Sequence, residues 1–176
     1  MEVPLAPFMG VLGVAPGSPG RTPTLRPGPH GGNMDCKELG VGATLFLPAH
    51  VPRALFSVGD GHGAQGDEEV DGAAIETGME RLVIEFGLRK GPPIRRPRAE
   101  TGKCLIFLAF DEDLDVAVLE ATRDVIGYLT KHHGLTQHEA YTLASIAVDF
   151  RIGQVVDGLK GVYVMLPKTL FEKNTI

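Results

Sequence analysis

At residues 57–69 the sequence reads Ser57-Val58-Gly59-Asp60-Gly61-His62-Gly63-Ala64-Gln65-Gly66-Asp67-Glu68-Glu69, directly after the apolar residues Ala54-Leu55-Phe56. Glycine allows backbone conformations and close approaches that other residues do not. Asp, Glu and His carry the lone pairs that bind divalent metals. A stretch so rich in both cannot form a core of its own. We interpret it as a functional polar loop, and the alternative is a solvated turn between two strands.

The composition indicates one globular domain whose first part is β-rich. The chain has 176 residues, of which 43% are hydrophobic and 22% charged, and this length allows one substantial core. Its 23 glycines and 13 prolines concentrate in the first hundred residues, which implies many turns and few long helices there. We predict a single domain over residues 1–176 that starts with an extended Pro/Gly-rich segment over residues 1–32.

Charge and cysteine content narrow the class of partner. The net charge of −5 argues against a nucleic-acid partner. Acidic residues gather in residues 60–76 and basic ones in residues 89–103, and such acidic clustering needs a nearby positive group, either that basic segment or a metal ion. Two cysteines without a disulfide framework fit a reducing cytoplasm. We expect no membrane partner, because no run reaches the length of a membrane span and no signal peptide is recognisable.

Apolar runs and alternation predict strands in the first 110 residues, at 8–15, 44–48, 54–58, 81–88 and 104–110. Residues 81–88 alternate most clearly, with Leu82, Ile84, Phe86 and Leu88 on one face, a pattern typical of a half-buried strand. Residues 16–32 are predicted to form a long loop of the kind that is functional or needs a partner surface. In the turn that follows, Asn33 and Asp35 either face a site or cap a short helical turn.

The apolar spacing changes after residue 110. Three- and four-residue steps predict an amphipathic helix that ends near Gly134, with Leu114, Ala117, Val118, Ala121, Val125 and Leu129 on its apolar face. Thr136 and Glu139 match a capping box, which opens a second helix running to about Asp149, with Ser145 and Asp149 on one face. Closing strands are expected at 152–157 and 162–166. The predicted fold class is α+β: a β-rich, sandwich-like or barrel-like layer with an αα pair near the C-terminus.

The polar stretch offers Asp60 and His62 as metal ligands. Residues two apart on an extended chain point the same way, and Asp35 could approach from the preceding turn. Two or three ligands suit an open catalytic site better than a closed structural one. Zinc is the expected metal because an imidazole is present, and calcium is the alternative because carboxylates are abundant.

A cysteine nucleophile is the rival chemistry. Cys36 lies beside Lys37 and Glu38, residue types that cysteine amidases use, but a thiolate needs such groups to converge in space. Cys104 begins an apolar strand and is interpreted as a core residue. A serine mechanism lacks the Gly-x-Ser-x-Gly elbow. Three further histidines have structural interpretations at helix ends, namely His132, His133 and His138.

Three segments resemble the acetamidase/formamidase family. They are Gly31-Gly32-Asn33-Met34-Asp35, residues 59–67 with their Gly-Asp-x-His-x-x-Gln-Gly pattern, and the run from Ser145 to Asp157. The match keeps this order over nearly the whole chain, starting at Pro7-Phe8-Met9-Gly10. The resemblance implies a β-rich, metal-dependent hydrolase that converts short linear amides to a carboxylate and ammonia.

The chain departs from the family in two ways. Glu68 stands where the family usually has a glycine, so a backbone position suited to positive φ carries a side chain. Family members are also longer, and their additional N-terminal part carries another Gly-His motif expected to join the same site. The chain therefore resembles a C-terminal portion of such an enzyme. It is expected to be an incomplete amidohydrolase that can be inactive alone, with a non-catalytic remnant or assembly module as the alternative.

The resemblance also suggests roles for individual residues. A divalent ion held by Asp60, His62 and Asp35 would lower the pKa of a bound water and polarise the amide carbonyl. Glu69 or Glu76 would be the general base and then the proton donor to the leaving amine. Gln65 and Asn33 would hydrogen-bond the amide or the developing oxyanion. A small amide is the expected partner, and we expect a homo-oligomer.

Overall fold

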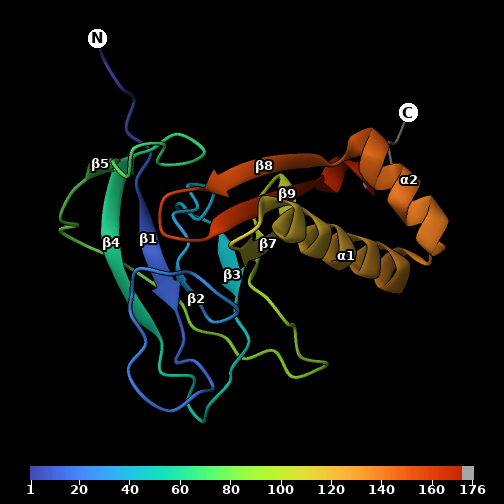
Figure 1. Ribbon diagram of the computed structural model, residues 1–176, viewed down its shortest axis with the longest axis horizontal. Coiled ribbons are helices and arrows are strands. Elements are labelled where there is room, and N and C mark those ends of the chain that lie inside the picture. Colours follow the sequence, from blue (N-terminus) through green and yellow to red (C-terminus); the bar gives the residue numbers. More distant parts are fainter. Residues whose placement is uncertain (172–176) are drawn as a thin grey trace.

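The computed structural model describes residues 1–171, which form two antiparallel sheets and a pair of helices (Figure 1). The smaller sheet has the order β2-β1-β4-β5, made of Gly31–Asn33, Phe8–Gly13, Ser57–Ala64 and Ile75–Glu76. The larger sheet has the order β3-β6-β7-β9-β8, made of Thr44–Phe46, Arg98–Glu100, Cys104–Asp111, Lys160–Pro167 and Asp149–Gln154. The predicted β-rich α+β class is confirmed.

Two helices cover one face of the larger sheet (Figure 1). Helix α1 (Leu114–His133) begins at the N-cap Asp113 and ends at Gly134, which has the left-handed φ of +69°. The predicted apolar stripe is confirmed, because Ala117, Ala121, Val125 and Leu129 are buried against β7 and β9. Helix α2 (Gln137–Ala147) opens with the predicted capping box. A short 3₁₀ helix, Lys168–Leu170, follows β9.

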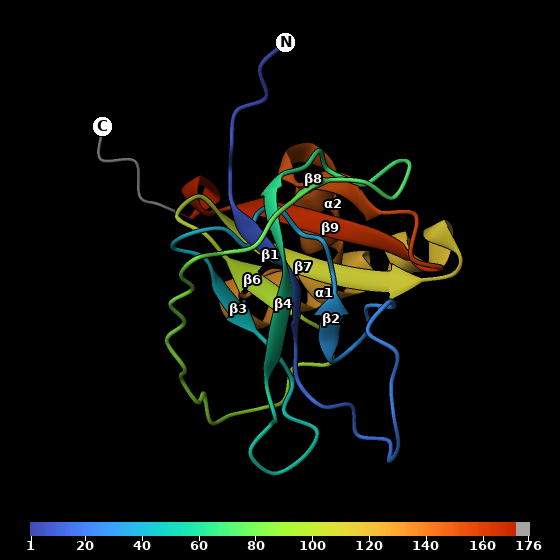
Figure 2. The same cartoon turned by 90° about the vertical axis from the view of Figure 1, so that its left-hand side faces the viewer.

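The opposite face of the larger sheet packs against the smaller sheet. Figure 2 shows β1 and β4 crossing in front of β7 and β9. The core between the two sheets is made of Leu12, Met34, Cys36, Leu39, Ala99, Ile106, Leu108, Tyr163 and Met165. The buried Tyr163 hydroxyl donates a hydrogen bond to the Met34 carbonyl. This contact fixes the chain immediately before Asp35.

The predicted loop at residues 57–69 is wrong for its first part, because residues 57–64 form the central strand β4. This strand pairs with β1 on one side and β5 on the other. Its glycines allow the close pairing: a Cβ at Gly61 would lie 2.6 Å from the Thr77 carbonyl oxygen. Hydrogen bonds to both neighbours compensate for a composition that is poor for a strand.

Three other predicted boundaries are corrected. Ala54 and Leu55 have φ of +55° and +54°, so they form a turn, and the strand predicted at 54–58 begins at Ser57. The predicted loop and turn over 16–36 contain the strand β2 at residues 31–33, paired with β1. The segment 81–88, predicted as a strand, has no regular secondary structure and belongs to neither sheet.

The second helix is shorter than predicted. It ends at Ala147, and the next residue, Val148, is extended with φ −119° and ψ 127°. Asp149 instead begins β8 and pairs with Met165 of β9, so Ser145 and Asp149 do not share a helix face. Pairing along β9 outweighs the helical pattern here. Among residues 1–171, no helix combines the length and hydropathy needed to cross a bilayer.

Candidate metal centre

Strand β4 and the chain after β2 bring the three predicted ligands together. Asp60 and His62 lie two residues apart on β4, and Asp35 follows β2 directly. The His62 Nε2 atom is 3.2 Å from Asp60 Oδ1 and 3.9 Å from Asp35 Oδ1. His62 and Asp35 are both 1% exposed. The structure thus collects two carboxylates and one imidazole in a largely buried site.

Gly10 of β1 leaves the space between these ligands open. A Cβ at this position would lie 2.5 Å from Asp35 Oδ1, 2.5 Å from Asp60 Oδ2 and 3.1 Å from His62 Nε2. Donor atoms of three side chains therefore lie around Gly10, and any larger residue there would collide with them. Carboxylate oxygens and an imidazole nitrogen are ligand types that calcium and zinc take in proteins. The residues present fit a divalent cation.

Gln65 fixes the orientation of the His62 ring. Its Oε1 lies 2.8 Å from His62 Nδ1, while its Nε2 donates to the Asp35 carbonyl oxygen at 2.8 Å. Because the Gln65 amide NH₂ is used by that carbonyl, its oxygen must accept from a protonated Nδ1. The Nε2 lone pair then faces the carboxylates, as in metal-bound histidines whose other nitrogen is hydrogen-bonded. Phe8 packs edge-on against the ring at 4.9 Å between centroids.

Asp35 has unusual backbone and electrostatic surroundings. Its φ is +45°, and its backbone N–H and that of Met34 both donate to the Gly10 carbonyl. Its Oδ2 accepts from Gln154 at 2.8 Å, whereas its Oδ1 is buried without a hydrogen-bond partner. Burial, followed by the charge of Glu69, raises the pKa of the Asp35 carboxyl to about 7. A buried unpaired carboxylate oxygen is costly unless a cation balances it.

Burial lowers the pKa of His62, but the Gln65 hydrogen bond and the carboxylates Asp60 and Asp35 outweigh this effect and raise the pKa overall. These acidic neighbours stabilise positive charge at the ring. A bound cation on the same side would satisfy them equally well.

Glu69 and Glu76 flank the site differently. Glu69 is buried, and its Oε1 lies 3.9 Å from His62 Nδ1 without a hydrogen-bond partner. Burial raises the pKa of its carboxyl. Glu76 lies on β5 opposite His62 and is exposed. Two sets of three potential ligands have donor atoms within 4.8 Å of one another, namely Asp35, His62 and Glu69, and Asp60, His62 and Glu76.

Asn33 belongs to a hydrogen-bond network with Asp157 and Gln154, two residues that were not among the predicted site residues. Its Nδ2 donates to Asp157 Oδ2 at 2.8 Å and to the Leu25 carbonyl at 3.2 Å. Gln154, which is fully buried, donates to both Asp35 and Asp157. Gln154 and Asp157 were visible only as part of the segment that resembles the family. A lone buried glutamine at a strand end carries no spacing signal of its own.

Cys36, the alternative nucleophile, lies in the core. It is fully buried, and burial raises the pKa of its thiol to about 12, so a thiolate is strongly disfavoured. The side chains of its neighbours Lys37 and Glu38 form ion pairs with other residues. Lys37 pairs with Asp67 at 3.0 Å, and Glu38 accepts from Arg151 at 2.8 Å.

The fold and the donor set define a β-rich α+β protein with a site suited to a divalent metal. Residues 17–173 match the model of the Acetamidase/Formamidase family, and the chain belongs to this family. The resemblance seen in the sequence is confirmed.

The relatives are longer than this chain. A Schizosaccharomyces pombe protein named as a candidate formamidase is 52% identical, and the match covers 73% of this chain and 37% of the relative. The formamidase of Methylophilus methylotrophus is 30% identical, with 76% and 38% covered. The crystal structure of a Bacillus halodurans acetamidase superposes with a TM-score of 0.84 at 32% identity, over 100% of this chain and 59% of that one. The chain spans under two fifths of these curated relatives.

Proposed function

We propose that this chain holds a divalent metal ion and serves the hydrolysis of short linear amides, of the formamide and acetamide type, to a carboxylate and ammonia. Family membership and the names of the relatives support this reaction class. The observation that carries the proposal is the convergence of Asp35, Asp60 and His62 beside Gly10.

Asp35 Oδ1, Asp60 and His62 Nε2 would hold the ion. A bound divalent ion supplies Lewis acidity, which polarises a carbonyl and lowers the pKa of water. Zinc is the first choice because of the imidazole, and calcium is the second because two of the three ligands are carboxylates. Gln65 keeps the His62 nitrogen turned toward the carboxylates, and Gln154 holds the other oxygen of Asp35.

Glu69 is the favoured proton carrier. Its buried, unpaired Oε1 and raised carboxyl pKa suit a group that takes a proton from water and then gives it to the leaving nitrogen. The attack of water forms the new C–O bond, and the C–N bond breaks as the nitrogen receives the proton and leaves as ammonia. Glu76 is the second candidate, because it is exposed and faces the same histidine across the β4–β5 pair.

Asn33 and Gln65 differ in what they can offer a substrate. Both functional ends of Gln65 are engaged within the chain, so we assign it to positioning His62. The Asn33 NH₂ group donates to Leu25 and Asp157, which leaves its Oδ1 to accept from the NH₂ group of an amide.

The decisive experiment combines metal analysis with an ammonia assay. Purified protein is analysed for bound zinc and calcium and assayed on formamide and acetamide, alone and together with the remaining part of a longer relative. We expect stoichiometric metal in the wild-type chain and its loss in His62→Ala and Asp60→Asn. In these variants ammonia release should fall together with the metal content. This applies to the assay of the chain alone or with the remaining part of the relative, whichever shows activity.

His138→Ala is the matched control, because this histidine lies in the first turn of α2 and outside the metal centre. It should keep both metal and activity. Unchanged metal content in His62→Ala would remove this residue from the ligand set and overturn the proposed site.

A further inference from the structure

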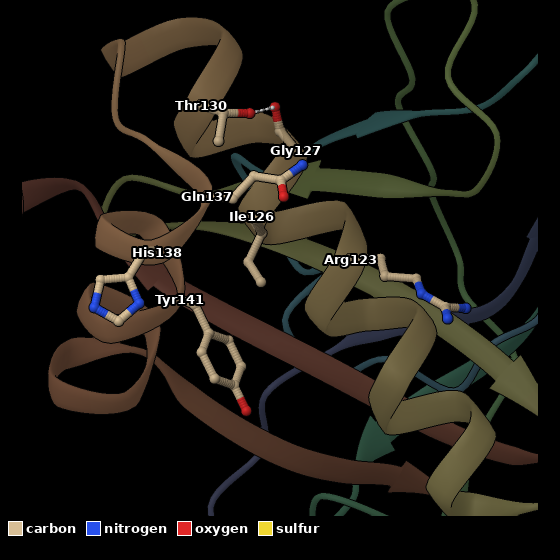
Figure 3. Close-up of a pocket in the computed structure, with 7 residues that line it drawn as sticks. All are labelled: Arg123, Ile126, Gly127, Thr130, Gln137, His138 and Tyr141. Carbon is tan, nitrogen blue, oxygen red and sulfur yellow. Dashed lines mark hydrogen bonds between the residues drawn. The ribbon is translucent and has the colours of Figure 1, made fainter.

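A large groove lies outside the metal centre. It has a volume of about 2250 Å³ and is bounded by residues 39–49, residues 79–95 and the last turns of α1. Small-molecule sites occupy ~300–1,000 Å³, so the groove is too large for a short amide and has the dimensions of a polypeptide site. A second pocket of about 570 Å³ lies between α1 and α2 and contains Gln137 and Tyr141 (Figure 3).

One wall of the groove is segment 81–88, which has no regular secondary structure and whose large apolar side chains are exposed. Val83 is 75% exposed, Phe86 70% and Leu88 80%. Among residues 1–171, no hydrogen bond involves the main chain of residues 79–91. An exposed extended segment with free N–H and C=O groups is a template for pairing with another strand.

Only a few contacts join segment 81–88 and the next residue, Arg89, to the rest of the chain. Phe86 packs edge-on against Phe56 at 5.1 Å between ring centroids, and the Arg89 guanidinium lies 5.3 Å above the centre of the Phe46 ring. These contacts fix the position of the segment and leave its outer apolar face uncovered. The segment runs along the outside of the two sheets (Figure 2).

The groove is basic although the chain is acidic. Lysines and arginines along the groove outnumber acidic residues by eight to three, whereas the whole chain has a net charge of −5. Arg98 of β6 and Lys131 of α1 also line the groove. The Arg98 guanidinium carbon lies 4.6 Å from the centre of the Phe107 ring. A partner surface with acidic residues around an apolar strand would complement it.

The relatives indicate which polypeptide would bind in the groove. The whole of this chain superposes on 59% of the Bacillus halodurans acetamidase with a TM-score of 0.84, so the same fold occurs there within a longer chain. A single compact molecule that contains this fold gains stability by burying such an apolar wall. In the longer relatives, the additional polypeptide is available to bury this wall.

We propose that the groove and segment 81–88 are the docking surface for the polypeptide by which the longer acetamidase/formamidase relatives exceed the matched region, and that an apolar strand bearing acidic neighbours pairs along residues 81–88. The proposal rests on family membership and the exposed wall. It does not depend on the metal or on amide hydrolysis.

The experiment mixes this chain with a separately purified polypeptide comprising the part of the Schizosaccharomyces pombe relative outside the match. Light scattering after size exclusion gives the stoichiometry, and amide hydrogen exchange reports residues 81–88. We expect a 1:1 complex and slower exchange in this segment. Phe86→Asp with Leu88→Asp should weaken the complex by roughly tenfold or more, as expected for central apolar contacts.

Tyr141→Asp is the matched control, because Tyr141 is also a large exposed side chain, at 58%, but lies on α2 in the other pocket (Figure 3). It should bind as tightly as wild type. The proposal is overturned if no complex forms between folded polypeptides, or if the control weakens binding as much as the double variant. Self-association of this chain through residues 81–88 would assign the surface to a second copy and also overturn it.

Discussion

The metal centre and segment 81–88 reverse the usual distribution of polar and apolar side chains in opposite ways. Asp35, His62 and Glu69 are polar and at most 7% exposed, whereas Val83, Phe86 and Leu88 are apolar and at least 70% exposed. Buried polar groups and exposed apolar patches are the informative exceptions in a folded chain. Each region is the basis of one proposed partner, a cation in the first case and a polypeptide in the second.

The two regions differ in how much a change at a single atom should alter the free energy. In the metal centre, charged atoms lie within a few ångströms of one another in a buried environment, where an unpaired charge is expensive. Along residues 81–88 the free energy depends on area, at roughly 25 cal/mol per Å² buried. Single substitutions should therefore have large effects in the metal centre and small effects on the isolated chain at the exposed wall.

The largest effect is expected for Gly10→Ala. Its Cβ would lie 2.5 Å from a carboxylate oxygen of both Asp35 and Asp60, so the ligands must move apart. We expect metal affinity to fall by on the order of 100-fold, the upper end of losses caused by disturbed ligand shells. Isothermal titration with zinc measures the change.

Gly59→Ala is the control for Gly10→Ala. Gly59 lies on β4, where a Cβ would meet nothing within 4 Å, and it pairs with Val11 of β1. Metal affinity should stay at the wild-type level. Equal losses in the two variants would show that strand distortion, and not the space between the ligands, controls binding.

A smaller loss in the same region is expected for Gln65→Met. The substitution keeps the length of the side chain but removes the contacts to His62 Nδ1 and to the Asp35 carbonyl. Loss of such a supporting hydrogen bond costs roughly 10–100-fold in metal affinity. Titration of the folded variant checks the value, and Gln65→Glu should recover part of the loss, because a carboxylate can still accept from Nδ1. Wild-type affinity in Gln65→Met would contradict the positioning role.

The sequence predicts which side chains come together in the first region, but it predicts a strand in the second region where the structure has none. The ligand spacing Asp60-x-His62 works in a loop or a strand, so the pair was identifiable even though β4 was mistaken for a loop. The alternation of Leu82, Ile84, Phe86 and Leu88 correctly indicates a segment suited to a sheet. This alternation cannot reveal whether a neighbouring strand is present, because pairing is a tertiary property.

Other parts of the site had no sequence signal. Gly10 matters because of what surrounds it, and Gln154 matters through a hydrogen bond to a residue 119 positions earlier. Neither property follows from local pattern. The helix α1, in contrast, was predictable in detail, because its caps and its apolar stripe are local features.

Cys36→Ala tests whether the buried cysteine has a structural or a catalytic role. The thiol is fully buried among core residues, so its removal should cost about 1 kcal/mol of unfolding free energy, as for a small core truncation. Metal content and ammonia release should not change. Chemical denaturation and the ammonia assay measure the two effects, and a loss of activity without a loss of stability would restore the cysteine hypothesis.

The smallest effect is expected for Phe86→Ser in the isolated chain. At 70% exposure, the ring buries little area, and its edge-on contact with Phe56 is its main interaction. We expect the unfolding free energy to change by less than about 0.5 kcal/mol, as for ordinary surface positions. Phe107→Ala, at 1% exposure in the helix-covered core, should cost ~3–5 kcal/mol in the same denaturation series. If Phe86→Ser instead destabilises the chain by several kcal/mol, residues 81–88 already belong to the core, and the wall is not free for a partner.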